Sequence, residues 1–94
     1  MKVTLSGKEF TLRCDMRALA AAQRDGVNVH ELGDDFVQVG TLVYHMAQSG
    51  AKHADVPFKH KLDDFLGLID VQDLEPMMLA VTEVMTVKGA EKKS

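Results

Sequence analysis

Few residues of this chain have the types and spacing that chemistry requires. No two of its four histidines are three or four residues apart, the spacing that places two metal ligands on one face of a helix. The single cysteine, Cys14, cannot form an internal disulfide, and the neighbouring Asp15 disfavours a thiolate nucleophile. We therefore expect neither a metal site nor a catalytic thiol. The four histidines are His30, His45, His53 and His60.

The carboxylates and glycines give no stronger indication of catalysis. The aspartates at 34–35 and at 63–64 are adjacent pairs, whose side chains on a helix point about 100° apart. Such pairs serve more often as helix caps and solvated faces than as an acid and a base acting together. Gly7-Lys8 is typical of a hairpin turn, and the sequence has no glycine-rich phosphate loop. We expect a non-catalytic protein without a cofactor.

Methionine is frequent in this chain, at six of 94 residues. Met77, Met78 and Met85 fall on one stripe of the predicted last helix. Their flexible side chains would either fill irregular gaps in a helical core or form an adaptable apolar binding surface. The spacing is compatible with both interpretations, which stay open at this point.

The charges are grouped along the chain and disfavour a nucleic-acid partner. The formal net charge is −3. Residues 2–24 carry five basic and two acidic groups, and residues 52–61 carry three basic groups and one acidic group. Residues 25–35 carry four acidic groups and residues 63–83 carry six, and neither of these two blocks contains a basic group. A duplex-binding protein needs a concentrated positive face, but the most periodic helices lie in or beside the acidic blocks.

The overall length and hydropathy predict one small domain that does not enter a membrane. A chain of 94 residues is long enough for one domain with a modest core. No apolar run reaches the roughly 18 residues of a membrane span, and no basic segment followed by an apolar stretch opens the chain. We therefore expect neither a transmembrane helix nor a signal peptide.

The first residues alternate between apolar and polar side chains and predict a β-hairpin. A two-residue type II′ turn at 7–8 would pair Leu5 with Phe10 and Val3 with Leu12. This register places all four apolar side chains on one face. Because a lone hairpin is marginal in water, we expect the helices that follow to cover that face.

The hairpin leads into a helix over about 16–25. Asp15 is its expected N-cap, and Gly26 is expected just after its last turn. A pattern typical of a capping box at 28–31 then opens one short turn that ends at Gly33.

A long helix over about 36–49 is expected next. Asp34 or Asp35 would cap it, and Gly50 would stop it. Its apolar side chains cover a broad arc, which marks it as the most buried helix of the domain.

Two further helical segments complete the prediction. Apolar residues from Phe58 onward repeat at helical spacing and predict a fourth segment that ends near Asp70. A last helix would begin at Asp73, with Pro76 in its first turn, and end at Gly89.

The predicted fold class is α+β, with an N-terminal β-hairpin followed by a small bundle of four to five helices. One hairpin-plus-helical domain would span 1–89. Residues 90–94 would form a flexible tail, because they have nothing to pack against.

The helix patterns also suggest protein-binding residues. Leu42, Leu79 and Val87 fall outside the main apolar stripes, and so small a domain has limited means of covering them. We expect the protein to self-associate into a homo-oligomer. With the methionine stripe added, the candidate protein-binding residues are Leu42, Met77, Met78, Leu79, Met85 and Val87.

The order of these elements resembles the tail assembly chaperones of long-tailed, siphovirus-type bacteriophages and prophages. The resemblance runs from Lys2 to about Met85 and consists of the hairpin with its Gly-Lys-Glu-Phe run, the Asp-Met-Arg-Ala-Leu helix start, and the Gly-Val-Asn-Val-His-Glu-Leu segment before a long apolar helix. The segment 55–60 is less acidic than the family's common pattern, so the boundary of the fourth helix stays open.

The resemblance implies a non-catalytic assembly factor in the cytoplasm of the bacterial host. Such chaperones coat the long apolar tape measure protein, recruit tail tube subunits, self-associate, and are absent from the finished virion. They are often made in two forms, the longer one by ribosomal frameshifting near the end of the shorter. The codons of Glu91-Lys92-Lys93 can be written as a slippery run, although this tripeptide is also common in solvated tails.

Two other functions are compatible with these residues. A small protein-binding regulatory adaptor or an antitoxin-like module would bind one partner through the edge of its hairpin. A helical nucleic-acid-binding domain is disfavoured by the grouping of the charges. The position of the gene would separate them, since a chaperone gene should lie between those for the tail tube and the tape measure protein.

Overall fold

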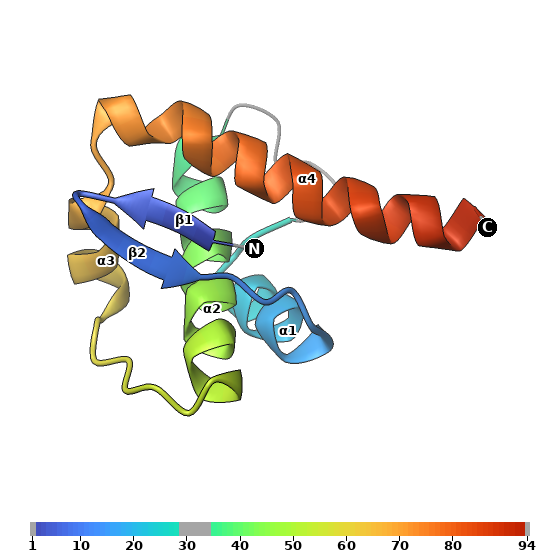
Figure 1. Ribbon diagram of the computed structural model, residues 1–94, viewed down its shortest axis with the longest axis horizontal. Helices are drawn as coiled ribbons and strands as arrows, with labels where there is room; N and C mark the ends of the chain where they lie inside the picture. The colour runs from blue at the N-terminus through green and yellow to red at the C-terminus, as the bar shows by residue number, and fades with distance from the viewer. Residues whose placement is uncertain (1, 29–34, 94) are drawn as a thin grey trace.

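Two antiparallel strands are followed by four α-helices and one 3-10 turn in the described part of the chain (Figure 1). The structure is a computed structural model that describes residues 2–28 and 35–93, with side chains as far as residue 83. The fold class is α+β, as the sequence predicts. The elements are β1 (Lys2–Leu5), β2 (Lys8–Thr11), α1 (Met16–Arg24), α2 (Phe36–His53), α3 (Leu62–Leu68), η1 (Val71–Asp73) and α4 (Leu74–Lys93).

The β-hairpin forms in a register that differs from the predicted one. Val3 lies opposite Phe10, and Leu5 lies opposite Lys8. The predicted pairing of Leu5 with Phe10 and of Val3 with Leu12 is therefore wrong. The partners differ by two residues, an even number, so the same side chains still face the core. Val3, Leu5, Phe10 and Leu12 are all buried.

The hairpin turn explains the shift. Ser6 and Gly7 both have positive φ values, +50° and +77°, which is the type I′ conformation and not the predicted type II′. A left-handed residue other than glycine costs about 1–2 kcal/mol. Ser6 is held there by two hydrogen bonds, because its amide donates to a carboxylate oxygen of Asp73 at 3.1 Å and its hydroxyl donates to the carbonyl of Leu68. The turn is thus fixed by a distant segment of the chain.

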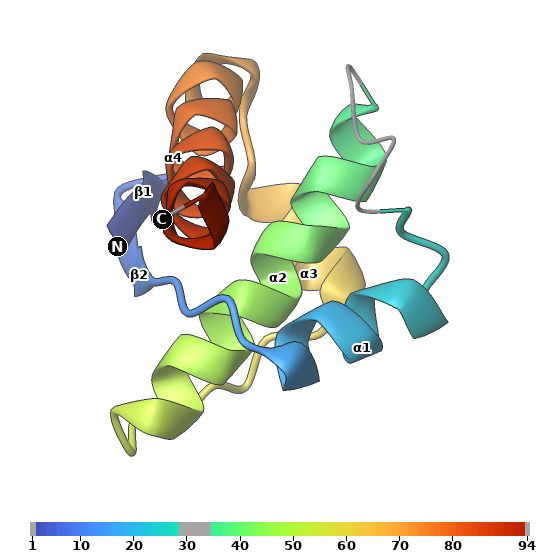
Figure 2. The same cartoon turned by 90° about the vertical axis from the view of Figure 1, so that its right-hand side faces the viewer.

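Helix α2 is the centre of the domain. It contacts α1, α3, α4 and β2, which surround it (Figures 1 and 2). Asp35, one of the two predicted caps, lies at its N-terminus and accepts a hydrogen bond from the amide of Gln38 at 3.1 Å. Every residue from 39 to 47 is buried. The prediction that this is the most buried helix of the described chain is confirmed.

Helix α2 continues through Gly50 to His53, so the predicted stop at Gly50 is wrong. A Cβ atom on Gly50 would lie 2.1 Å from the carbonyl oxygen of Thr11. Close by, the amide of Arg13 donates a hydrogen bond to the carbonyl of Met46 at 3.0 Å. The glycine therefore allows the end of β2 to pass directly against the helix, and it does not break the helix.

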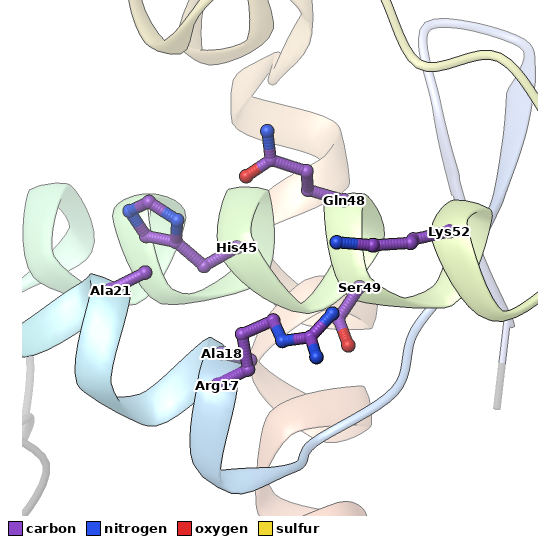
Figure 3. A pocket seen from close by; sticks show the side chains of 7 residues that line it. All are labelled: Arg17, Ala18, Ala21, His45, Gln48, Ser49 and Lys52. Carbon is purple, nitrogen blue, oxygen red and sulfur yellow. The ribbon is translucent and has the colours of Figure 1, made fainter.

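Helix α1 packs along one side of α2 and is bounded as predicted. Asp15 is its N-cap and accepts a hydrogen bond from the amide of Ala18 at 2.9 Å. Gly26 follows the last turn with a φ of +90°. The small residues of α1 lie beside α2 (Figure 3), where Ala18 and Ala22 are buried. The predicted turn that ends at Gly33 lies outside the described residues.

The C-terminal helices differ from the prediction at their boundaries. Helix α3 begins at Leu62, because the ring of Phe58 lies in an extended connection and packs against an aromatic ring of the hairpin. Helix α4 begins at Leu74 and continues through Gly89 to Lys93. The predicted end at Gly89 is wrong, since an internal glycine costs a helix only about 1 kcal/mol and no proline follows it. The flexibility of residues 90–94 remains a prediction.

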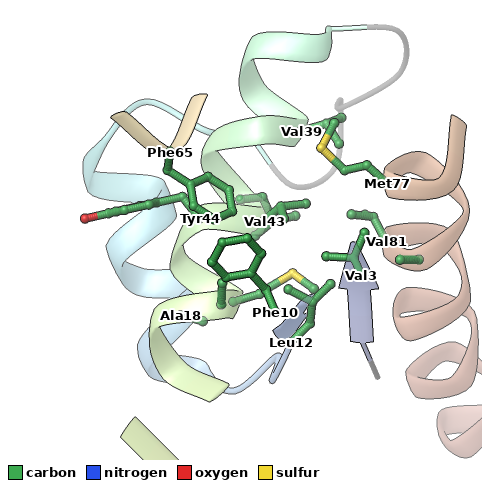
Figure 4. Close-up of a cluster of buried hydrophobic side chains, with 14 of the residues drawn as sticks. Val3, Phe10, Leu12, Ala18, Val39, Val43, Tyr44, Phe65, Met77 and Val81 are labelled. Carbon is green, nitrogen blue, oxygen red and sulfur yellow. The ribbon is translucent and has the colours of Figure 1, made fainter. Parts of the chain in front are cut away.

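One hydrophobic core joins the hairpin to helices α2, α3 and α4 (Figure 4). The ring centroid of Phe65 lies 5.1 Å from that of Phe10 and 5.5 Å from that of Tyr44. On the side of α4, Met77 and Val81 are buried. The apolar face of the hairpin is thus covered by helices, as the sequence predicts.

Candidate protein-interaction surfaces

Three successive candidate residues of α4 lie at three depths. Met77 is fully buried, Met78 is half-buried against the core, and Leu79 is 62% exposed. Successive residues of a helix point about 100° apart, so one turn of α4 contributes both to the core and to the surface. Of the three, Leu79 offers the most apolar surface to a partner.

Leu42 and Met77 are core residues. Neither has any exposed surface. Leu42 belongs to the helix that the other elements surround, and Met77 lies next to Val39 in the core (Figure 4). The prediction that these two side chains contact a partner is therefore wrong for the folded chain, and Met77 follows the core interpretation of the methionine stripe. The side chains of Met85 and Val87 lie outside the described ones.

The polar groups nearest to a catalytic arrangement do not form a triad. The Nε2 atom of His45 lies 2.6 Å from a carboxylate oxygen of Asp25. The nearby hydroxyl of Ser49 donates to Asp15 at 2.8 Å and not to His45. A serine nucleophile needs a hydrogen bond to the histidine base, so this geometry does not activate Ser49.

The described residues offer no cluster of metal ligands. No group of three or more histidine, cysteine or acidic side chains among them is placed to hold an ion. Cys14 is half-buried and packs against the core. The absence of catalysis, of a metal and of a cofactor in this protein remain predictions.

A small apolar hollow lies beside β2. Its volume is about 180 Å³, and Phe10, Val56, Pro57 and Phe58 contribute to its walls. The sheet in the described chain contains only β1 and β2, so the outer edge of β2 is not paired with another strand. An unpaired edge beside an apolar hollow is the arrangement that a strand-like peptide can use.

A basic groove lies between α1 and α2, and the sequence alone did not predict it. Arg13, Arg17 and Lys52 line it together with Asp15 and Ser49. Residues 2–24 and 52–61 were separate basic blocks in the sequence, and only the packing of the two helices brings them together. The grouping of basic residues along the chain was the only sequence signal for this groove. That grouping does not specify which basic blocks come together in the fold.

Asp15 is held as a carboxylate at one end of this groove. The amide of Ala18 lowers the pKa of Asp15 most, with further lowering by the hydroxyl of Ser49 and by Arg13, whose Nε atom lies 3.4 Å away. These donors use the capacity of Asp15 to accept hydrogen bonds. Arg13 is the cation that pairs with Asp15, and neither Arg17 nor Lys52 forms an ion pair with it.

Comparison of the chain with protein-family models, with characterised proteins and with solved structures found no match. Among the described helices, none combines the length and the apolar character needed to cross a bilayer.

Proposed function

We propose that this protein is a tail assembly chaperone of a long-tailed bacteriophage or prophage. It binds the tape measure protein in the cytoplasm of the bacterial host, keeps it soluble, and helps to recruit tail tube subunits. It acts as a homo-oligomer, without catalysis, and without binding nucleic acid or a membrane. The basis of the proposal is the resemblance of the sequence from Lys2 to about Met85.

The observation that best supports the proposal is the exposure of Leu79 on α4. The backbone of the C-terminal half of α4 extends away from the rest of the domain (Figure 1). An apolar helical client needs apolar surface to bind, and many copies of a weak site act together when the client is long. An acidic protein with a net charge of −3 would also keep the assembly soluble.

Co-expression tests this proposal directly. The tape measure protein encoded by the same genome is expressed alone and together with this chain, and its soluble fraction is measured after centrifugation. We expect the tape measure protein to aggregate alone and to become soluble and co-purify when this chain is present. If its solubility is unchanged and no complex forms, the proposal is wrong.

Self-association has its own test. A long client is coated by many copies, so the purified protein should form oligomers as its concentration rises. Light scattering over a concentration series measures this. A strict monomer at high micromolar concentration would contradict the oligomeric part of the proposal.

The two-product scheme of the family extends the proposal to the gene. A slippery heptamer in the codons for 91–93, with an overlapping reading frame downstream, would produce a longer form by ribosomal frameshifting. Reading the gene decides this point. Without that heptamer and frame, residues 91–93 are only part of the helix end.

A small regulatory adaptor or an antitoxin-like module is the second candidate. The observation that favours it is the unpaired edge of β2 beside the apolar hollow of Phe10, Val56 and Phe58. Such a module would bind one partner by adding a strand to β2. Glu9→Pro, at an exposed residue of β2, would then abolish partner binding, whereas a chaperone that binds through α4 would keep its client.

A further inference from the structure

The groove between α1 and α2 consists of two adjoining hollows that share part of their lining. One part, of about 250 Å³, is lined by Ala18, Ala21 and His45, and the other, of about 380 Å³, by Arg13 and Asp15. Both parts share Arg17, Ser49 and Lys52 (Figure 3). We call the two hollows together the α1–α2 groove. It has an apolar end and a cationic end.

Two cations of the α1–α2 groove have no side-chain partner among the described residues. Arg17 and Lys52 are exposed, and neither forms an ion pair or a hydrogen bond through its side chain with any described residue. Asp15 is the only carboxylate in the lining, and it forms an ion pair with Arg13, whose Nε atom lies 3.4 Å away. The cationic end therefore carries an excess of positive charge on a chain whose net charge is −3.

The apolar end contains a buried polar atom without a partner. His45 is 8% exposed, and its Nε2 atom is taken by Asp25. Its Nδ1 atom is buried and has no hydrogen-bond partner among the described residues. Buried polar groups are nearly always satisfied in native proteins, and among the described side chains this atom and Nδ1 of His60 are the two exceptions. Ala18 and Ala21 leave room next to this ring (Figure 3).

We propose that the α1–α2 groove binds an acidic peptide segment of a protein partner. Two carboxylates of the segment pair with Arg17 and Lys52, and an adjoining apolar side chain packs over Ala18 and Ala21. The guanidinium of Arg17 can hold a carboxylate through two parallel hydrogen bonds. This inference is independent of the proposed function and of α4.

Nucleic acid is a weaker match to the same groove. A phosphate backbone would use the cationic end and leave the apolar end empty. An acidic group also lies at the apolar end of the groove, since Asp25 lies against His45. A polyanion that extends past the groove would meet this charge, whereas a short peptide would not.

Fluorescence anisotropy with a labelled peptide tests the proposal. The probe is a fluorescein-labelled hexapeptide with one leucine among glutamates and aspartates, and its control is the same peptide with every acid replaced by its amide. We expect the full chain to bind the acidic peptide and not the amide peptide. The R17Q/K52Q double variant should bind about tenfold more weakly, which is the effect of losing two partly exposed charge pairs.

The matched control is the K59Q/K61Q double variant. It changes the net charge by the same amount at two exposed lysines outside the groove, and it should bind like the unmodified chain. Amide NMR spectra report whether each variant is folded, and peptide-induced shifts should cluster in α1 and at 45–53.

Four results would overturn the inference. The first is equal binding by R17Q/K52Q and the unmodified chain, and the second is equal binding of the amide peptide. The third is displacement of the peptide by an equal concentration of inorganic phosphate, which would identify only a general anion site. The fourth is stronger competition by oligodeoxythymidine than by unlabelled acidic peptide, which would assign the groove to nucleic acid.

Discussion

The two long helices of this domain have similar lengths and different surroundings. Helix α2 contacts α1, α3, α4 and β2 and is buried from residue 39 to residue 47, whereas α4 contacts β1, α2 and η1 and exposes Leu79. Leu42 of α2 has no exposed surface, and Leu79 of α4 is 62% exposed. Both leucines lie outside the main apolar stripes predicted from the sequence. The same residue type in the same kind of helix thus has two different environments.

This difference in burial predicts which residues contribute to the stability of the fold and which are available to bind a partner. The middle of α2, residues 39–47, is buried throughout, so it contributes its apolar surface to stability and leaves none for a partner. A helix that is covered on one side keeps apolar surface that a partner can bury. We therefore expect substitutions at residues 39–47 of α2 to change the free energy of unfolding, and substitutions on the exposed face of α4 to change binding of the client.

The largest effect is expected at the centre of α2. Leu42→Ala should lower the free energy of unfolding by about 3–5 kcal/mol, because it removes buried methyl groups and leaves a cavity. Urea unfolding followed by circular dichroism measures this. A loss below about 1 kcal/mol would show that α2 is not enclosed as described.

The close contact between α2 and β2 should give the next largest effect. In Gly50→Ala the new Cβ atom would lie 2.1 Å from the carbonyl oxygen of Thr11, and this backbone atom must move. We expect a loss of about 2–3 kcal/mol in urea unfolding. Gly67→Ala is the matched control, because a Cβ there meets nothing within 4 Å. Equal stabilities of the two variants would contradict the contact.

The cap of α1 should add a smaller and pH-dependent effect. The folded state lowers the pKa of Asp15 below its usual 3.8, chiefly through the amide of Ala18. The stabilisation is therefore fully present above that value and is lost as the pH falls through the lower, folded pKa. Asp15→Ala should cost about 1 kcal/mol at neutral pH and less in acid. Urea midpoints at neutral and acid pH measure the difference. A cost that does not change with pH would contradict a charged cap.

The smallest effect on stability is expected at the exposed leucine of α4. Leu79→Ala should change the free energy of unfolding by no more than about 0.5 kcal/mol, because the side chain is already largely in water. The comparison with Leu42→Ala uses the same substitution in the other long helix, measured by the same urea titration. A loss at Leu79 that approaches the loss at Leu42 would remove the distinction between the two helices.

Local sequence patterns predicted the helices and strands well, and they predicted the contacts between these elements less well. The caps at Asp15 and Asp35 depend on neighbours three residues away, and both were found. The turn at Ser6 depends on hydrogen bonds to Leu68 and Asp73, more than sixty residues away, and its type was mispredicted. Gly50 was read as a helix stop for the same reason, because its role is set by Thr11 of a distant strand.

The binding surfaces, like the turn at Ser6, depend on contacts between distant parts of the chain and not on local patterns. Periodicity placed Leu42 and Leu79 outside the main stripes alike, and only the packing of the other elements decides which of them is covered. The α1–α2 groove needs Arg17 and Lys52 to meet from two helices. A sequence shows both basic blocks but not that they share a groove, because that depends on how α1 crosses α2.

The central claim is that the exposed face of α4 binds the tape measure protein. The direct measurement is a pull-down of that protein by Leu79→Gln and by Met16→Gln, a control whose side chain is 77% exposed on α1. We expect Leu79→Gln to retain about tenfold less client, since a leucine buried on binding contributes roughly 1.5–3 kcal/mol, while Met16→Gln and both stabilities stay unchanged. Equal retention of the client by Leu79→Gln and the unmodified chain would contradict the claim.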